Sequence, residues 1–143
     1  MEKSNYKDSM FRMLYLDRKE LLSLYNAVNG THYTNAEELE INTLRNAIYM
    51  NIKNDVSFLF NFQVNLYEQQ STVNPNMPLR DLFYVADLLQ NYVRDLDLYG
   101  RGLVKIPAPR FIVFYNGKEK QPERRVYKLS DAFTTKQDEP ELE

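Results

Sequence analysis

Asp55, Glu68 and Gln70 are the residues of this sequence whose types and spacing could do chemistry. They belong to two short runs, one aromatic and apolar and the other alternating, which are separated by Asn61 and Phe62. Two such runs around a two-residue connection predict an antiparallel β-hairpin. Counting outward from this turn places Asp55 directly opposite Glu68, and the alternation of the strand puts Gln70 on the same face.

A metal ion is the expected companion of this pair of carboxylates. Opposed side chains on an antiparallel ladder have Cβ atoms roughly 5 Å apart. Two carboxylates at that separation repel each other unless a proton or a cation lies between them, and oxygen ligands suit Mg²⁺, Mn²⁺ or Ca²⁺. In the alternative interpretation Asp55 ends a turn and Glu68 pairs with a nearby Lys or Arg. A different hairpin register would also separate the two acids.

The composition leaves few other routes to catalysis. The sequence has no Cys, which excludes thiolate chemistry, disulfides and cysteine-ligated zinc, and its one His, His32, argues against a catalytic triad or a multi-histidine metal site. It also lacks a Gly-rich phosphate loop and the HExxH and GxSxG motifs. Carboxylates that hold a metal ion need none of these, because the metal lowers the pKa of a bound water.

The length and charge of the chain suit one globular domain. The sequence has 143 residues, of which 43% are hydrophobic and 27% charged. We expect a single domain over residues 1–136 and an acidic tail over 137–143, in which alternation suggests the start of a truncated strand. No apolar run approaches the ~18 residues of a membrane span, and the first residues do not resemble a signal peptide, so we expect a cytoplasmic protein without membrane contact.

The order of sequence signals predicts an α/β fold with a mixed central sheet flanked by helices. Asp17 is expected to cap a helix that ends at Gly30, and Pro78 suits the first turn of a long helix. The expected helices cover 9–14, 17–29 and 76–98. The expected strands cover 40–44, 55–60, 63–70, 110–115 and 125–129, with a weaker signal over 47–50. The apolar strand 110–115 is expected to be buried on both faces.

Several further residues could contact a polyanionic substrate. Arg80 and Asp81 lie at the start of the long helix, where the positive end of the helix dipole favours anions, although a surface role is equally consistent with the sequence. Tyr67 could stack on a base. Lys118, Arg124 and Arg125 belong to a basic stretch over 118–128, which is either a phosphate-binding edge or a solvated hairpin.

Short sequence words spread over nearly the whole chain resemble a known family of nucleases. The words are KDSMFR at 7–12, NDVSF at 54–58, LYEQQST at 66–72, NPNMPLR at 74–80, PRF at 109–111, YNG at 115–117 and LSD at 129–131. As a set they resemble the PD-(D/E)xK nuclease superfamily and, more narrowly, the Rpn-type recombination-promoting nuclease / putative transposase family of bacteria. The resemblance implies a restriction-endonuclease-like core of a helix, a three-stranded antiparallel meander, a helix and a strand.

The resemblance also implies roles for individual residues. Asp55 and Glu68 would bind one or two Mg²⁺ or Mn²⁺ ions, with the backbone carbonyl of Gln69 as a further ligand. Gln70 stands where the superfamily pattern has Lys; a neutral amide can orient a water molecule but supplies no charge. Asp8 and Glu20 lie in the N-terminal helical region, where related nucleases place an extra carboxylate, although we favour a capping role for Glu20.

The function expected from this resemblance is metal-dependent hydrolysis of DNA, linked to recombination or mobile elements. The alternative is a catalytically inactive nuclease-fold module that binds nucleic acid or a protein partner, for example a mobile-element or phage inhibitor. A third candidate, a purely structural interaction domain, is favoured by the net charge of −2, since duplex DNA binding draws on a basic surface. A homodimer is also compatible with the sequence.

Overall fold

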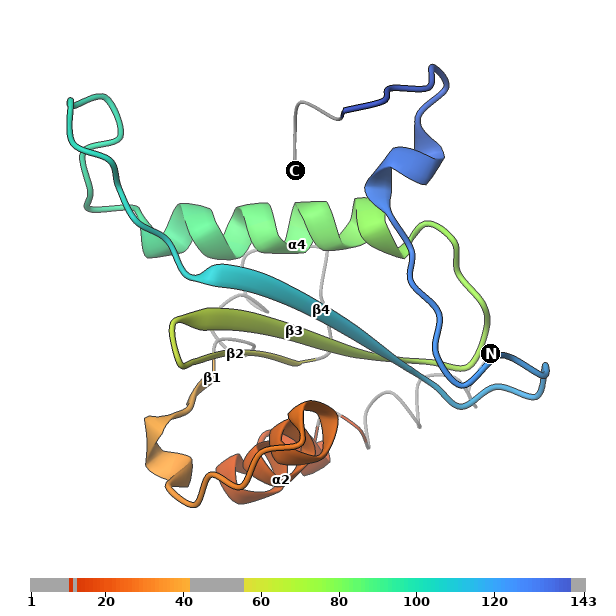
Figure 1. The fold of residues 1–143 in the computed structure, drawn as a ribbon. Coiled ribbons are helices and arrows are strands. Elements are labelled where there is room, and N and C mark those ends of the chain that lie inside the picture. The colour runs from red at the N-terminus through yellow and green to blue at the C-terminus, as the bar shows by residue number, and fades with distance from the viewer. Residues whose placement is uncertain (1–10, 12, 42–55, 140–143) are drawn as a thin grey trace.

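The computed structural model describes residues 11, 13–41 and 56–139 of the chain. Its described part is a mixed α/β arrangement in which a four-stranded sheet, ordered β1-β2-β3-β4, lies between a helix on each face (Figure 1). The elements are α2 (Arg18–Asn29), a 3-10 turn η1 (Ala36–Glu38), β1 (Glu40–Ile41), β2 (Val56–Phe60), β3 (Gln63–Gln70), α4 (Met77–Tyr92), β4 (Ala108–Tyr115) and a 3-10 turn η2 (Leu129–Ala132).

Helix α2 begins and ends where the sequence predicts. The side chain of Asp17 accepts hydrogen bonds from the backbone N–H groups of Lys19 and Glu20, which satisfies two donors that the first helical turn leaves free. Gly30 ends the helix in the left-handed conformation with φ 64°, which glycine adopts without strain. Helical backbone at residue 11 and over 13–15 agrees with the predicted short helical turn near 9–14.

The β2–β3 hairpin has the predicted register. Asn61 and Phe62 form the turn with φ values of 51° and 60°, and positive φ at both central residues is the geometry that matches the twist of paired strands. Phe60 pairs with Gln63, and the ladder continues to the pair Val56↔Tyr67. Asp55 lies outside the described residues.

The two faces of the sheet carry two separate hydrophobic clusters. On the α2 face, alternate residues of β2 and β3 pack against the helix; the buried members are Leu21, Leu22, Tyr25, Leu39, Val56, Phe58, Phe60 and Tyr67. On the α4 face, Val64 and Leu66 pack against Tyr84, Val85 and Leu88. The period of two along β3 therefore directs Val64, Leu66 and Glu68 towards α4, as the sequence predicts.

Strand β4 runs parallel to β3, and α4 forms the connection between them (Figure 1). The expectation that this strand is buried on both faces was wrong, because β4 is the last strand in the order of the described sheet. Phe111 and Val113 each keep 39% of their surface exposed. The predicted end of the long helix was also wrong, since α4 ends at Tyr92 rather than near residue 98. Asp97 there accepts hydrogen bonds from the N–H groups of Tyr99 and Gly100 in a turn.

The predicted strand over 125–129 is absent. Residues 116–128 are irregular and lead into η2, where Lys128 N–H donates to the Asp131 carboxylate. Val126 is 69% exposed, so the apolar side chain of this alternating segment does not pack against the rest of the protein. The predicted strand over 40–44 is described only at Glu40–Ile41, and 47–50 lies outside the described residues.

Within the described residues, no helix is long and apolar enough to span a membrane.

Candidate functional site

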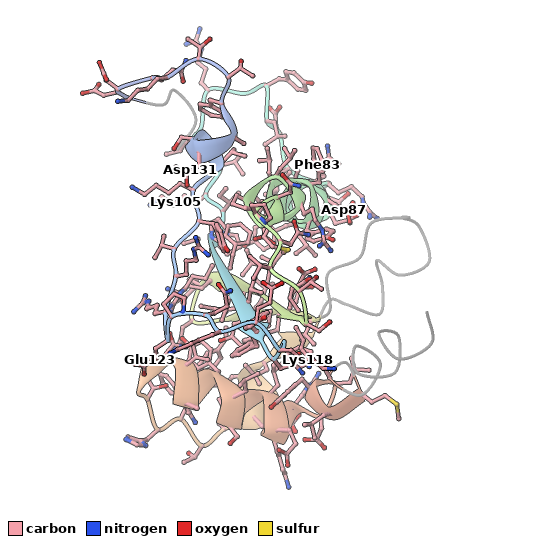
Figure 2. All side chains as sticks on the ribbon, turned by 90° about the vertical axis from the view of Figure 1, so that its right-hand side faces the viewer. Phe83, Asp87, Lys105, Lys118, Glu123 and Asp131 are labelled. Carbon is pink, nitrogen blue, oxygen red and sulfur yellow. The ribbon has the colours of Figure 1, made fainter. Side chains whose placement is uncertain are left out.

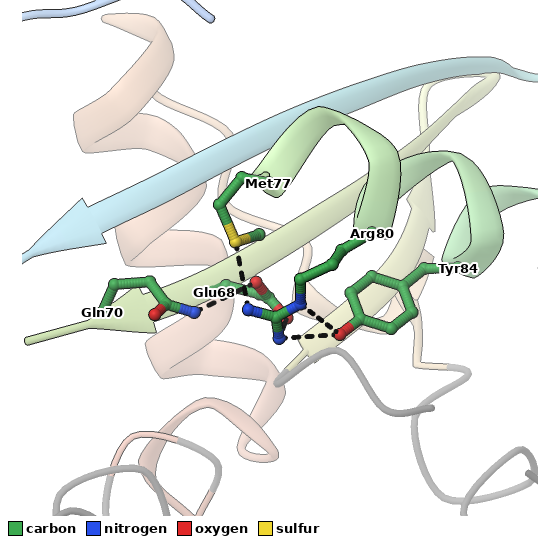
Figure 3. A network of polar contacts seen from close by, with 5 residues as sticks. All are labelled: Glu68, Gln70, Met77, Arg80 and Tyr84. Carbon is green, nitrogen blue, oxygen red and sulfur yellow. Dashed lines mark hydrogen bonds and ion pairs between the residues drawn. The ribbon is translucent and has the colours of Figure 1, made fainter. Parts of the chain in front are cut away.

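Glu68 is a buried carboxylate between the end of β3 and the first turns of α4. Only 2% of the residue is exposed, because its place in the strand directs it towards the helix. Its Oε1 lies 3.6 Å from an Arg80 guanidinium nitrogen, and its Oε2 accepts a hydrogen bond of 3.5 Å from Gln70 Nε2 (Figure 3). Three of the residues singled out from the sequence therefore meet in one place. The ion pair itself is the arrangement that the alternative interpretation of Glu68 predicted.

Arg80 is held in this position mainly by its own helix. Its Nε and one terminal nitrogen donate to the Tyr84 hydroxyl at 3.1 and 2.8 Å, and the other terminal nitrogen lies 3.3 Å from the Met77 sulfur (Figure 3). These partners are three and four residues away, the spacing at which helical side chains are neighbours. Burial lowers the pKa of Arg80, but the Tyr84 hydrogen bond and the Glu68 charge outweigh it and raise the pKa above its usual value.

The start of α4 is fixed by the turn that follows β3. Asn74 accepts hydrogen bonds from Asn76 N–H through its side chain and from Met77 N–H through its carbonyl. Pro78 occupies the first turn, where no backbone N–H is needed, and Arg80 N–H donates to the carbonyl of Asn76. This short connection places the helix start beside the end of β3.

Asp81, the neighbour of Arg80, is a second buried acid on α4. It is 7% exposed, and within the described residues no hydrogen bond reaches its carboxylate. Burial raises its pKa to about 6, an effect that the positive charge of Arg80 only partly offsets. Burial also raises the pKa of Tyr84, while the Arg80 hydrogen bond lowers it and the Glu68 charge raises it. Ionisable groups on this part of α4 therefore influence one another.

Two further expected site residues, Tyr67 and Gln69, lie on β3 and alternate with Glu68, so they belong to the opposite face of the sheet. Tyr67 is 1% exposed and makes edge contacts with the rings of Phe58 and Phe114, with centroids 5.0 and 5.5 Å apart. A ring buried in this way is not available to stack on a base, so the substrate-binding role expected for Tyr67 does not agree with its position. Gln69 pairs with Phe114 in the parallel ladder.

Glu20, which was considered as an additional acid of the site, is not brought to Glu68. Glu20 lies on α2, which covers the opposite face of the sheet, and its backbone N–H takes part in the Asp17 cap (Figure 1). This position is consistent with the capping role that we favoured for Glu20 and not with a role as an extra metal ligand. Asp8 lies outside the described residues, as does Asp55.

The basic residues after β4 are exposed and lie in the irregular segment 116–128. Lys118, Arg124 and Arg125 belong to this segment, which lies at the end of the molecule where β3 ends and α4 begins (Figures 1 and 2). The Arg125 guanidinium lies over the Tyr127 ring, 5.3 Å from its centroid, and donates to Gln121. No hydrogen bond or ion pair connects these three side chains with Glu68 or Arg80 among the residues described.

The donor chemistry at Glu68 fits a hard divalent cation. The carboxylate of Glu68 and the side-chain oxygen of Gln70 are the ligand types that Mg²⁺ and Mn²⁺ prefer. Within the described residues no group of three acidic or histidine side chains converges, and Asp55 is not among these residues. Among the described residues, the guanidinium of Arg80 is the cation that lies beside Glu68.

Tyr84, Met77 and Asp81 complete the surroundings of Arg80, and sequence reasoning gave the first two no role. The signal that could have found them is their spacing of three and four residues from Arg80 on the predicted helix. The burial of Asp81 could not be read from its type, because aspartate is seldom buried.

Comparison of the chain with protein-family models, with curated proteins and with solved structures found no match in any of the three. A function has to be argued from the residues of the chain and their arrangement.

Proposed function

We propose that this protein is a metal-dependent nuclease that hydrolyses DNA phosphodiester bonds, with Asp55 and Glu68 as its metal-binding carboxylates. The observation that carries the proposal is the hairpin register, which reaches the pair Val56↔Tyr67. Continued by one more pair, the same register would set Asp55 opposite Glu68. Opposed residues share a face of the sheet, and for Glu68 that face is the one covered by the start of α4.

The order of elements supports the same proposal. A helix is followed by three antiparallel strands, a second helix and a strand that runs parallel to β3. This is the order of helix, antiparallel meander, helix and strand that a PD-(D/E)xK core requires, as the resemblance of the sequence implies. The resemblance implies an active site on the second and third strands of that core.

Each site residue has a role consistent with its chemistry. Asp55 and Glu68 would hold Mg²⁺ or Mn²⁺, with the carbonyl of Gln69 as a further ligand; the metal would supply a more acidic water and offset charge on the phosphate. Gln70, hydrogen-bonded to Glu68, would orient the attacking water. Arg80 is the cationic side chain beside the acid and would contact a phosphate oxygen.

A catalytically inactive nuclease-fold module is the second candidate, and two observations favour it. Glu68 is paired with Arg80 at 3.6 Å, so its charge is compensated without a metal ion. Gln70 supplies no positive charge where the superfamily pattern has Lys. Such a module would bind nucleic acid or a protein partner, as an inhibitor encoded by a mobile element or a phage does.

The experiment that separates the two is DNA cleavage by the purified chain. Supercoiled plasmid and single-stranded DNA are incubated with Mg²⁺ or Mn²⁺, with an EDTA control, for the unchanged protein and for the Asp55→Ala and Glu68→Ala variants. The Asp95→Ala variant, which removes an exposed acid beyond α4, is the matched control. Cutting that requires metal, survives in the control and is lost in both site variants supports the nuclease. A folded but inert protein, or equal cutting by all variants, excludes this active site.

A further inference from the structure

The positive charge beside the Glu68 carboxylate is the guanidinium of Arg80. The Glu68 side chain is 3% exposed, whereas the Arg80 side chain keeps 36% of its surface accessible. A buried carboxylate without a compensating charge is costly, and the guanidinium at 3.6 Å provides that compensation. A divalent cation at the same carboxylate would therefore meet a positive charge that is already in place.

The contacts of Arg80 show that it does not depend on Glu68 for its position. Its hydrogen bonds to the Tyr84 hydroxyl, at 2.8 and 3.1 Å, are shorter than its 3.6 Å approach to Glu68. The Met77 sulfur, at 3.3 Å, holds a third nitrogen. Most of the donors used by the guanidinium are thus occupied by its own helix, and the carboxylate could exchange its cation without leaving Arg80 unpaired.

We propose that Arg80 is a displaceable counter-ion of Glu68, which neutralises the carboxylate in the metal-free protein and competes with a divalent cation for it. Binding of the cation moves the guanidinium away from Glu68, and its exposed side then becomes available to an anion such as a phosphate group. This inference rests on the proposed function, because it takes Glu68 to be a ligand of a divalent cation. By this inference the Glu68–Arg80 ion pair is exchangeable rather than permanent.

The first test measures Mn²⁺ binding without any substrate. Electron paramagnetic resonance reports the free Mn²⁺ concentration for the unchanged protein and for the Arg80→Met, Arg80→Lys and Arg94→Met variants. Arg94 is an exposed arginine just beyond α4 and controls for the general effect of removing one positive charge. We expect Arg80→Met to bind Mn²⁺ at least ~tenfold more tightly than the unchanged protein, and Arg94→Met to bind it almost equally. Arg80→Lys keeps the charge and should stay near the unchanged affinity.

The second test observes Arg80 directly in the unchanged protein and uses a variant only to assign the signal. The side-chain Nε–H signal of Arg80 in a ¹⁵N-correlated NMR spectrum, assigned by its loss in Arg80→Lys, should shift as Mg²⁺ is added. A structural ion pair that persists would leave this signal in place. The shift should saturate at the Mg²⁺ concentration at which binding saturates.

The outcomes separate this inference from the function on which it rests. If the unchanged protein binds Mn²⁺ but Arg80→Met binds it no more tightly, and the Arg80 signal does not move, the counter-ion exchange is excluded while the metal site stands. If neither protein binds Mn²⁺, both the exchange and the proposed metal site are excluded. Tighter binding by Arg80→Met together with a moving signal supports the exchange.

Discussion

The effect of replacing Asp81 with Asn on stability should depend on pH and be more favourable in alkaline than in acid solution. The carboxyl group is 7% exposed and its pKa is raised from 3.8 to about 6, chiefly by burial. A folded-state pKa above the unfolded value means that the folded protein binds the proton more tightly between these two pH values. Stability from this group is therefore greatest below pH 4 and is lost as the pH rises towards 6 and beyond.

The size of the effect follows from the two pKa values. Their difference corresponds to a factor of about a hundred in proton affinity, or about 3 kcal/mol of unfavourable free energy once the group is ionised in both states. An amide buried at the same place has its own desolvation cost, of about 1 to 3 kcal/mol, but this cost does not change with pH. The effect of Asp81→Asn on the free energy of unfolding should therefore be more favourable at pH 8 than at pH 4 by about 2 kcal/mol or more.

Urea unfolding monitored by tyrosine fluorescence and circular dichroism at the two pH values measures this difference. The exposed residue Asp95, changed to Asn, serves as the control for the loss of one negative charge. A stability change for Asp81→Asn that is the same at both pH values, or that matches the control, would show that burial does not disfavour the ionised carboxylate.

Substitutions at three further positions test the elements that position the site, all by urea unfolding. Phe62→Gly should stabilise the hairpin by roughly 0.5 kcal/mol or more, because Phe62 adopts a φ of 60° while 94% exposed; a loss of stability would contradict the strain argument. Phe58→Ala should cost ~3 to 5 kcal/mol, because this fully buried ring joins β2 to the α2 cluster, and a cost below ~1 kcal/mol would contradict that packing. Asp17→Ala should cost ~1 kcal/mol through loss of the α2 cap, whereas Asp17→Asn should retain most of it.

Local chemistry made much of the fold predictable from the sequence. Asp17 and Gly30 carry the capping and left-handed preferences that begin and end α2, and these act within a few residues. The hairpin register follows from the short turn and from alternation along β3, and its prediction is confirmed up to Val56↔Tyr67. The mixed sheet with helices on its faces is likewise confirmed.

The parts that could not be predicted depend on contacts between distant segments. The alternating residues near Val126 have strand-like character, but a strand needs a neighbour with which to pair, and the segment is irregular and exposed. The apolar strand β4 lies last in the described sheet order, a position that its sequence does not record. Tyr67 was expected beside the site as a binding residue, but alternation places it in the core on the other face.

At the site, the sequence predicted that Glu68 and Gln70 share a face of β3, and it left open whether Glu68 faces a metal ion or pairs with a Lys or Arg. The position of Glu68 on β3 and of Arg80 on α4 follows from strand and helix periodicity. Their pairing depends on the turn at Asn74–Asn76, which sets where α4 begins relative to the end of β3. The partners of Arg80 then follow from helical spacing once that starting point is known.

The most direct test of the proposed metal site is a crystal structure of the protein with bound Mn²⁺, using the anomalous scattering of the metal. We predict an anomalous peak within coordination distance of carboxylate oxygens from both Asp55 and Glu68, with the Arg80 guanidinium displaced from Glu68. A structure in saturating Mn²⁺ without a peak at Glu68, in which Arg80 keeps its ion pair with that carboxylate, would contradict the assignment of a metal-dependent nuclease.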